Sequence, residues 1–187
     1  MGTAHAPAPA ALTVGITFAD RGALGETLEM LKLEYGPVEF ASPEFVFDMT
    51  DYYISEMGEN LRKQFFCFRN PIRLEMLPGI KHRTNEIEQR LARVEGDRIR
   101  RRVNLDPGYV TLAKLVLATT KDYSHRVYIG EEMYAETTLR FVRGTFTPFE
   151  TTYPDHQTPL ALEFFNAARE FVKRSLPAWM PESASNA

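Results

Sequence analysis

The pattern of hydrophobic and polar positions predicts a strand followed by an amphipathic helix at the start of the chain. Residues 12–18 alternate apolar with small or polar side chains, which is typical of a strand. The next apolar positions have helical spacing, at Leu24, Leu28, Leu31 and Tyr35. Asp20 is placed to cap this helix, which we expect over residues 23–35, and Gly36 to end it.

A second round of the same pattern follows. Extended structure is predicted over residues 38–48 and 61–68, on either side of a polar connection at 47–58. A helix is predicted over 85–95, because Asn85 and Glu88 stand in the N-cap and N3 positions of a capping box. The basic residues 81–83 would then lie just before a helix N-terminus, which suits an anion.

The longest apolar-rich run, residues 103–142, is expected to form the centre of the core. Within it, Asp106-Pro107-Gly108 predicts a turn. Residues 112–119 fit either a short helix or a buried strand, because periodicity alone does not separate the two. Residues 125–129 and 133–142 predict a β-hairpin joined by 130–132.

The remaining elements complete the fold prediction. Residues 144–149 extend the hairpin, and Thr158-Pro159 begins a last helix that Pro177 ends. The order strand, helix, strand, strand, helix, strand is the split β-α-β pattern. We therefore predict an α+β fold of the ferredoxin-like class, with a C-terminal β-hairpin and helix added. The expected organisation is a disordered lead at 1–11, a single domain at 12–177 and a frayed tail at 178–187.

Composition narrows the classes of function. A net charge of −3 and a pI near 5.9 argue against a dedicated nucleic-acid binder. The single Cys67 excludes an internal disulfide and fits a reducing cytosol. No apolar run approaches the roughly 20 residues of a membrane span, and the Ala/Pro-rich start lacks the features of a secretory signal. A soluble cytoplasmic protein without a membrane partner is expected.

Six motifs along the chain resemble one known family. They are TDYYxxEMG at 50–58, KxxTNxxE at 81–88, NLDPGY at 104–109, LATTKDYSHRVY at 117–128, YAETTL at 134–139 and TYPD at 152–155. In this order and spacing they are similar to the bacterial family called domain of unknown function 4416, over about residues 13–171. The resemblance implies no established activity, although members often carry an automatic "GTP-binding" label.

A standard GTPase site is not encoded in this sequence. A P-loop requires GxxxxGK[ST] between a strand and a helix, so that backbone N–H groups surround the phosphates, and no such run exists. Thr120-Lys121-Asp122 is similar to a guanine-reading TKxD, but the spacer before the aspartate is missing. Nucleotide binding by another scaffold stays open.

Metal and nucleophile sites are also not predicted. Asp106, Asp122, His125 and Glu136 are acceptable ligand types, but no helical pairing of histidines places them on one face. Ser124 and His125 are neighbours that would point to opposite faces of a strand, and no GxSxG run is present. No catalytic residue is assigned, and the sequence does not identify a cofactor.

A mixed-charge binding site is the function that these residues favour. Charged and aromatic groups lie beside the most apolar part of the chain, where an unpaired charge requires a partner. Arginine and lysine suit a phosphate and tyrosine suits a ring, so we predict an anionic small molecule or nucleotide as ligand. The predicted ligand-binding residues are Tyr52, Tyr53, Glu56, Lys81, Asn104, Asp106, Lys114, Lys121, Asp122, His125, Arg126 and Glu136.

Three alternatives remain at this point. Arg126 and Glu136 could form only a cross-strand ion pair on a solvated face, rather than a polar wall shared with Tyr128 and Thr138. The chain could be a protein-interaction module without a small ligand, or a hydrolase or transferase acting on a phosphorylated metabolite. A concave pocket that joins residues 50–56 to the polar residues of 104–138 would favour a ligand binder; a flat, apolar-centred patch would favour an interaction module.

Overall fold

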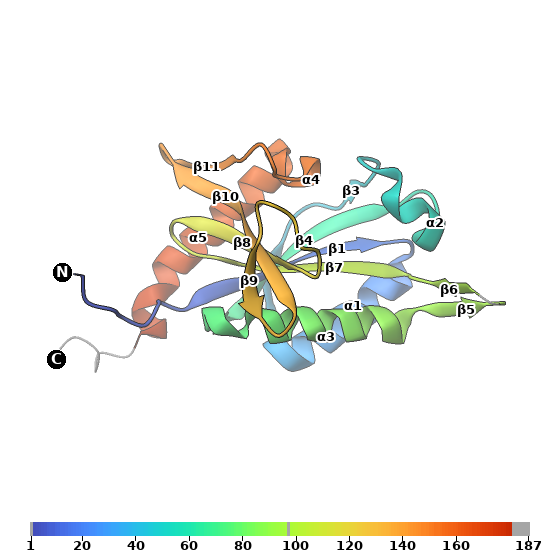
Figure 1. The fold of residues 1–187 in the computed structure, drawn as a ribbon, viewed down its shortest axis with the longest axis horizontal. Helices are drawn as coiled ribbons and strands as arrows, with labels where there is room; N and C mark the ends of the chain where they lie inside the picture. The colour runs from blue at the N-terminus through green and yellow to red at the C-terminus, as the bar shows by residue number, and fades with distance from the viewer. Residues whose placement is uncertain (1, 97, 181–187) are drawn as a thin grey trace.

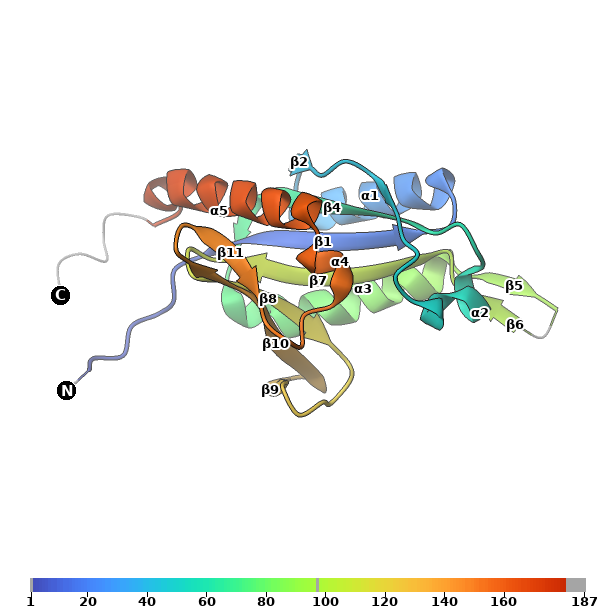
Figure 2. The same cartoon turned by 90° about the horizontal axis from the view of Figure 1, so that it is seen from above.

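A large antiparallel sheet forms the centre of the computed structural model, which describes residues 2–96 and 98–180. The strands are β1 (Ala10–Phe18), β2 (Val38–Ala41), β3 (Phe45–Val46), β4 (Arg62–Ile72), β5 (Arg93–Glu95), β6 (Arg98–Arg100), β7 (Val103–Val110), β8 (Lys114–Thr119), β9 (Val127–Gly130), β10 (Met133–Val142) and β11 (Thr145–Pro148). Nine of them make one sheet in the order β11-β10-β8-β7-β1-β4-β2, with β3 on β4 and β9 on β10. The β5–β6 hairpin projects from one end of the molecule (Figure 1, Figure 2).

Helices cover both faces of this sheet. The helices are α1 (Arg21–Tyr35), α2 (Ile54–Met57), α3 (Leu77–Leu91), α4 (Pro154–Gln157) and α5 (Pro159–Trp179), with 3₁₀ turns at η1 (Asp51–Tyr53) and η2 (Leu74–Met76). α1 and α3 pack on one face against Leu12, Val14 and Ile16 of β1. α5 packs on the other face against Phe65 and Cys67 of β4 (Figure 1). An α+β fold with a large antiparallel sheet is therefore confirmed.

The first strand and helix form as the sequence predicts. The side chain of Asp20 accepts a hydrogen bond from the Ala23 N–H at 2.8 Å, and Gly36 ends α1 with a φ of 87°. β1 begins at Ala10 rather than Leu12, and it is buried along its whole length because helices cover both faces of the sheet. β1 is thus the central strand on which the core is built.

The prediction for the second helix was wrong in its start and in its end. α3 begins at Leu77, with Pro78 in the first turn, where the missing N–H removes no helical bond. Asn85 consequently lies inside the helix and is not its cap. The basic residues 81–83 are also helical and do not precede a helix N-terminus. Residues 93–95 belong to β5 and not to the helix.

The predicted turn at Asp106-Pro107-Gly108 is also wrong, because all three residues lie within β7. Pairing with β8 begins only at Gly108, so Pro107 is placed where that side of β7 has no ladder to interrupt. A Cβ at Gly108 would come within 2.4 Å of the Val116 carbonyl oxygen. This glycine is therefore explained by the close approach of β8 and not by a turn.

The C-terminal half matches the prediction more closely. Residues 114–119 form the strand β8, which settles the choice between helix and strand. β9 and β10 pair as the predicted hairpin, and β11 extends it. The Thr158 side chain caps α5 by accepting from the Ala161 N–H at 3.1 Å, but the helix continues through Pro177 to Trp179. The tail predicted to fray lies, from residue 181, outside the described residues.

In the described part of the chain, no helix is both long and apolar enough to cross a membrane.

Candidate functional site

A pocket of about 750 Å³ lies between the 47–53 segment, α3, the strands β7 and β8, and α4. Eight of the twelve predicted binding residues line it: Tyr52, Tyr53, Lys81, Asn104, Asp106, Lys121, Arg126 and Glu136. The polar residues of the 104–138 region and the tyrosines of the 50–56 loop therefore meet at one concave site. We call it the central pocket.

The other four predicted residues lie outside the lining. Glu56 is at its edge, where its Oε2 atom lies 2.9 Å from Arg101 Nε. His125 Nε2 lies 2.9 Å from Oε2 of Glu136, which does line the pocket. Asp122 lies beside Tyr134, whose pKa its charge raises. Lys114 is exposed at the far end of β8.

Lys63 forms the floor of the central pocket, and the sequence did not single it out. Its Nζ atom lies 2.8 Å from Asp106 Oδ2 and 2.7 Å from Asp155 Oδ2, with its side chain 3% exposed. It also lies over the rings of Phe47 and Phe65. Burial alone would lower the pKa of Lys63, but the two carboxylates raise it above its ordinary value. The lysine is therefore a fixed cation.

The two carboxylates beside Lys63 are fixed as anions. Burial alone would raise the pKa of Asp106, but the charges of Lys63 and Lys81 outweigh it and hold the pKa below 3.8. The pKa of Asp155 is held far below its ordinary value, because His156 and Lys63 outweigh the effect of burial. His156 Nδ1 lies 3.1 Å from Asp155 Oδ1, and its ring stacks on Phe165.

A second group of charges lies where α3 meets β7. Glu88 of α3 accepts a hydrogen bond from the Leu105 N–H at 2.6 Å and another from Arg101 Nη1 at 3.0 Å. Burial raises the pKa of Glu88, an effect that Lys81 and the Leu105 N–H partly offset. Lys81 Nζ donates to the Leu105 carbonyl oxygen at 2.8 Å. Among the described residues, no carboxylate lies within 4.0 Å of the Lys81 ammonium.

Arg126 and Glu136 form one wall of the central pocket, beside β9 and β10. Arg126 Nε lies 2.7 Å from Glu136 Oε2, so the two side chains lie on one side, although Arg126 is one residue before β9 and not in a strand. Both residues are buried, at 9% and 6% exposed, so the pair is not on a solvated face. Tyr128 is 62% exposed and Thr138 is fully enclosed, and neither joins the wall as predicted. Register shifts after Met133 and after Thr137 break the alternation on which that prediction depended.

Tyrosines and cations alternate around the rim. Lys121 Nζ lies 4.1 Å from the centre of the Tyr52 ring, and the Arg126 guanidinium lies 4.5 Å from that of Tyr123. Arg101 lies 5.6 Å from the ring of Tyr53, which is packed against Phe47. The 47–53 segment is thus attached across the pocket through its rings.

A family model matches residues 8–171, which is most of the chain, and its description is domain of unknown function (DUF4416). The chain belongs to this family. Comparisons with curated proteins and with solved structures gave no match.

The six motifs of this DUF4416 chain converge on the central pocket. Each of them supplies at least one lining side chain: Tyr52 and Tyr53, Lys81 and Glu88, Asn104 and Asp106, Lys121 and Arg126, Glu136, and Asp155. Lys63 lies in no motif, which is one reason why the sequence did not reveal it. The motifs are far apart along the chain, but the fold brings residues from all six of them to one site.

Among the described residues, no group of three or more His, Cys, Asp or Glu side chains is arranged to hold a metal ion. The carboxylates of the DUF4416 pocket are instead engaged by Lys63, Arg101 and Arg126.

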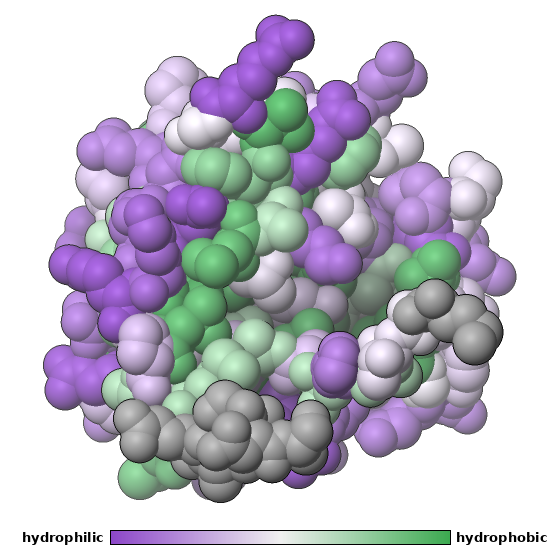
Figure 3. Space-filling model, turned by 90° about the vertical axis from the view of Figure 1, so that its left-hand side faces the viewer, coloured by the Kyte–Doolittle hydropathy of each residue, from purple (hydrophilic) through white to green (hydrophobic). Residues whose placement is uncertain are grey.

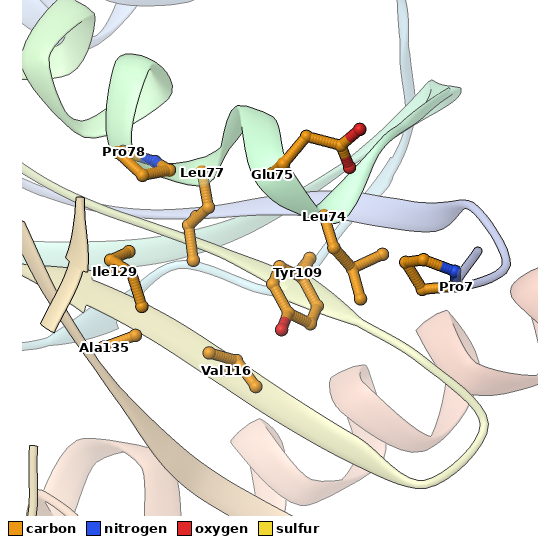
Figure 4. Close-up of a pocket in the computed structure, with 9 residues that line it drawn as sticks. All are labelled: Pro7, Leu74, Glu75, Leu77, Pro78, Tyr109, Val116, Ile129 and Ala135. Atoms are coloured by element: carbon orange, nitrogen blue, oxygen red, sulfur yellow. The ribbon is translucent and has the colours of Figure 1, made fainter. Parts of the chain in front are cut away.

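A second groove lies beside the start of α3 and is almost entirely apolar. Figure 4 shows Leu74, Leu77, Tyr109, Val116 and Ile129 around it, with Pro7 at one end. Figure 3 shows green, hydrophobic surface running between polar regions on the end of the molecule that is at the left in Figure 1. Glu75 is the one charged residue of the groove lining, so charged chemistry is concentrated in the central pocket.

Proposed function

We propose that this protein binds a nucleotide or a related anionic small molecule in the central pocket. The observation that carries the proposal is the environment of Lys81. Its side chain lines the pocket, the residue is 8% exposed, and its ammonium has a single hydrogen-bond acceptor, the Leu105 carbonyl, among the described residues. The carboxylates of Asp106 and Glu88 act on this ammonium from beyond ion-pair contact, so its burial is only partly compensated. An anionic ligand would supply the missing partner.

The aromatic rim supports a ligand that also carries a ring. Tyr52, Tyr53 and Tyr123 line the pocket near Lys121. Tyrosine offers a flat apolar face together with a hydroxyl, which suits a nucleobase. GTP is one candidate, and it would be held here without a P-loop.

The shape of the site supports a ligand binder over an interaction module. The polar residues face a concavity and not a flat patch, and about 750 Å³ falls within the range of roughly 300–1,000 Å³ that is usual for small-molecule sites.

We also propose that the strands β7-β1-β4-β2, with α1 and α3, are a ferredoxin-like core to which the remaining strands and α5 are added. The support is their order in the sheet and the packing of both helices on one face.

A ligand screen by thermal unfolding tests the proposal. GTP, ATP, other nucleotides and inorganic phosphate are titrated separately, and at about 100 times Kd a ligand that binds only the folded protein should stabilise it by roughly 2.7 kcal/mol. No shift with any of these compounds would contradict nucleotide binding.

Two matched variants locate the site. Lys121→Met should weaken binding about tenfold, because it removes a rim cation next to Tyr52. Lys114→Met removes an exposed lysine from the other end of the same region, outside the pocket, and should leave the affinity unchanged. Equal effects of the two substitutions would place the ligand elsewhere.

A further inference from the structure

We propose that Asp106 recognises hydroxyl groups of the ligand, so that the class of ligand is a ribonucleotide or a sugar phosphate with a free vicinal diol. This inference rests on the proposed function, because it concerns the same pocket. It adds a requirement that anion binding alone does not impose.

Asp106 lines the central pocket and is partly exposed. It lies on β7, in the middle of the sheet, yet its side chain is 30% exposed. The two groups that hold it, Lys63 and Asn104, are 2% and 7% exposed. The Asp106 carboxylate is therefore available to a molecule in the central pocket.

The carboxylate is held in one orientation and keeps unused acceptor capacity. Oδ2 accepts from Lys63 Nζ at 2.8 Å, and Oδ1 accepts from Asn104 Nδ2 at 3.0 Å. Asn104 is oriented in turn by Arg101, whose Nη2 donates to its Oδ1 at 3.4 Å. A carboxylate accepts about four hydrogen bonds. Both oxygens can therefore accept one more, and two adjacent hydroxyl groups match two adjacent oxygens.

The surrounding charges select a neutral donor. A cationic group of the ligand would meet Lys63 in ion-pair contact with Asp106, and also Lys81, whose charge reaches the carboxylate. An anionic group would be repelled by Asp106 itself. A hydroxyl avoids both repulsions, and its hydrogen bond to an ionised carboxylate is stronger than one between neutral groups.

Lys81 and Asp106 together describe a ligand with two kinds of group. Both line the pocket, and they are farther apart than an ion pair. In a sugar phosphate, too, the phosphate and the ring hydroxyls are different groups that lie apart within one molecule. An anion at Lys81 and a diol at Asp106 can therefore belong to one molecule.

Calorimetric titration of the full chain with paired probes tests this inference. The probes are ATP and GTP, their 2′,3′-dideoxy analogues, and ribose 5-phosphate. A site built to bond a hydroxyl discriminates strongly against an analogue that lacks it, so the ribonucleotide should bind at least about tenfold more tightly than its dideoxy analogue. Asp106→Asn should reduce this ratio to about threefold or less, mainly by weakening the ribonucleotide.

The outcomes separate this inference from the proposed function. Equal affinity of wild-type protein for a ribonucleotide and its dideoxy analogue overturns hydroxyl recognition and leaves nucleotide binding intact. Binding of ribose 5-phosphate as tight as that of ATP or GTP supports hydroxyl recognition and assigns the ligand to the sugar phosphates. If no probe binds, both proposals fall. The wild-type comparison decides the matter even where Asp106→Asn does not fold.

Discussion

Gly15 leaves the space in which Lys63 crosses β1 to reach Asp106. Gly15 is paired with Asp106 on one side and with Phe65 of β4 on the other, so it lies between the two strands that the lysine joins. A Cβ at Gly15 would lie 3.1 Å from Lys63 Cε and 3.3 Å from the Phe65 ring. The glycine therefore permits the charged floor of the pocket.

Gly15→Val should destabilise the protein. A branched side chain at this position would press on both Lys63 and Phe65, and overpacking of this kind costs about 1–3 kcal/mol. Urea unfolding measures the loss. Gly25→Ala is the control: it lies on the exposed side of α1 with open space around it, and there alanine should stabilise by about 0.5–1 kcal/mol. If the free energy of unfolding of Gly15→Val equalled that of wild type, Lys63 would be able to reach Asp106 without the space at Gly15.

Lys63→Met should make stability depend on pH in a new way. The folded pKa values of Asp106 and Asp155 lie below 3.8, so the stability they contribute is fully present above about pH 4 and is lost as the pH falls through the folded values. Without Lys63, the buried carboxylate of Asp155 and the partly exposed carboxylate of Asp106 are left together, and the pKa of at least one should rise above its unfolded value. That group takes up a proton on folding, and the variant gains stability as the pH falls.

The measurement is the difference in unfolding free energy between Lys63→Met and wild type. It should be about 3–5 kcal/mol at pH 7, because a buried ion pair has lost one partner. It should shrink from pH 7 to pH 5. Lys114→Met, an exposed control, should show a small difference that is flat with pH. A difference for Lys63→Met that grew toward pH 5 would contradict the assignment of charges.

Lys81→Met should stabilise the protein without ligand and remove its response to nucleotides. Methionine keeps the length of the side chain and removes a buried charge that has no carboxylate in ion-pair contact among the described residues, which should gain about 1 kcal/mol. Thermal unfolding with and without the ligand measures both effects. If the variant without ligand lost 1 kcal/mol or more, the bond from Lys81 to the Leu105 carbonyl would be structural, and the main support for an anion site would disappear.

Arg126→Met should be strongly destabilising even without ligand. The guanidinium contacts Glu136 at 2.7 Å and the Lys121 carbonyl oxygen at 3.1 Å. Its loss leaves the buried Glu136 carboxylate with His125 as its remaining partner among the described residues and no permanent cation, at a cost of about 3–5 kcal/mol. Adding Glu136→Gln should recover part of this loss, because the stranded charge is removed. A double-mutant cycle by urea unfolding measures the coupling. A value near zero would mean that the two side chains act independently.

The sequence predicts well those features that depend on local chemistry. The Asp20 cap, the Gly36 stop and the Thr158 cap are decided within a few residues, and each is present. The errors occur where a distant strand decides the outcome. Asp106-Pro107-Gly108 has the composition of a turn, but β1 and β8 hold it as a strand.

The candidate site shows the same division. Arg126 was identified because it interrupts an apolar run, whereas Lys81 was identified as a basic residue before an expected helix N-terminus and in fact lies inside α3. Lys63 was missed because it lies among the aromatic residues of β4, and only the pairing of β4, β1 and β7 brings it to Asp106. Lys114 was included because it is close in sequence to the site, but β8 carries it away from the pocket.

The central pocket has a floor made of core strands and a rim made of connecting segments. Substitutions should therefore be tolerated less well at the floor than at the rim. A substitution at Lys63 or Asp106 alters the sheet and the site together, so few such changes can survive. Tyr52 and Tyr123 are 55% and 50% exposed, and replacing them changes what the pocket faces with little effect on the core. If the proposed ligand is correct, substitutions at the rim would change which ring the pocket accepts and leave the floor unchanged.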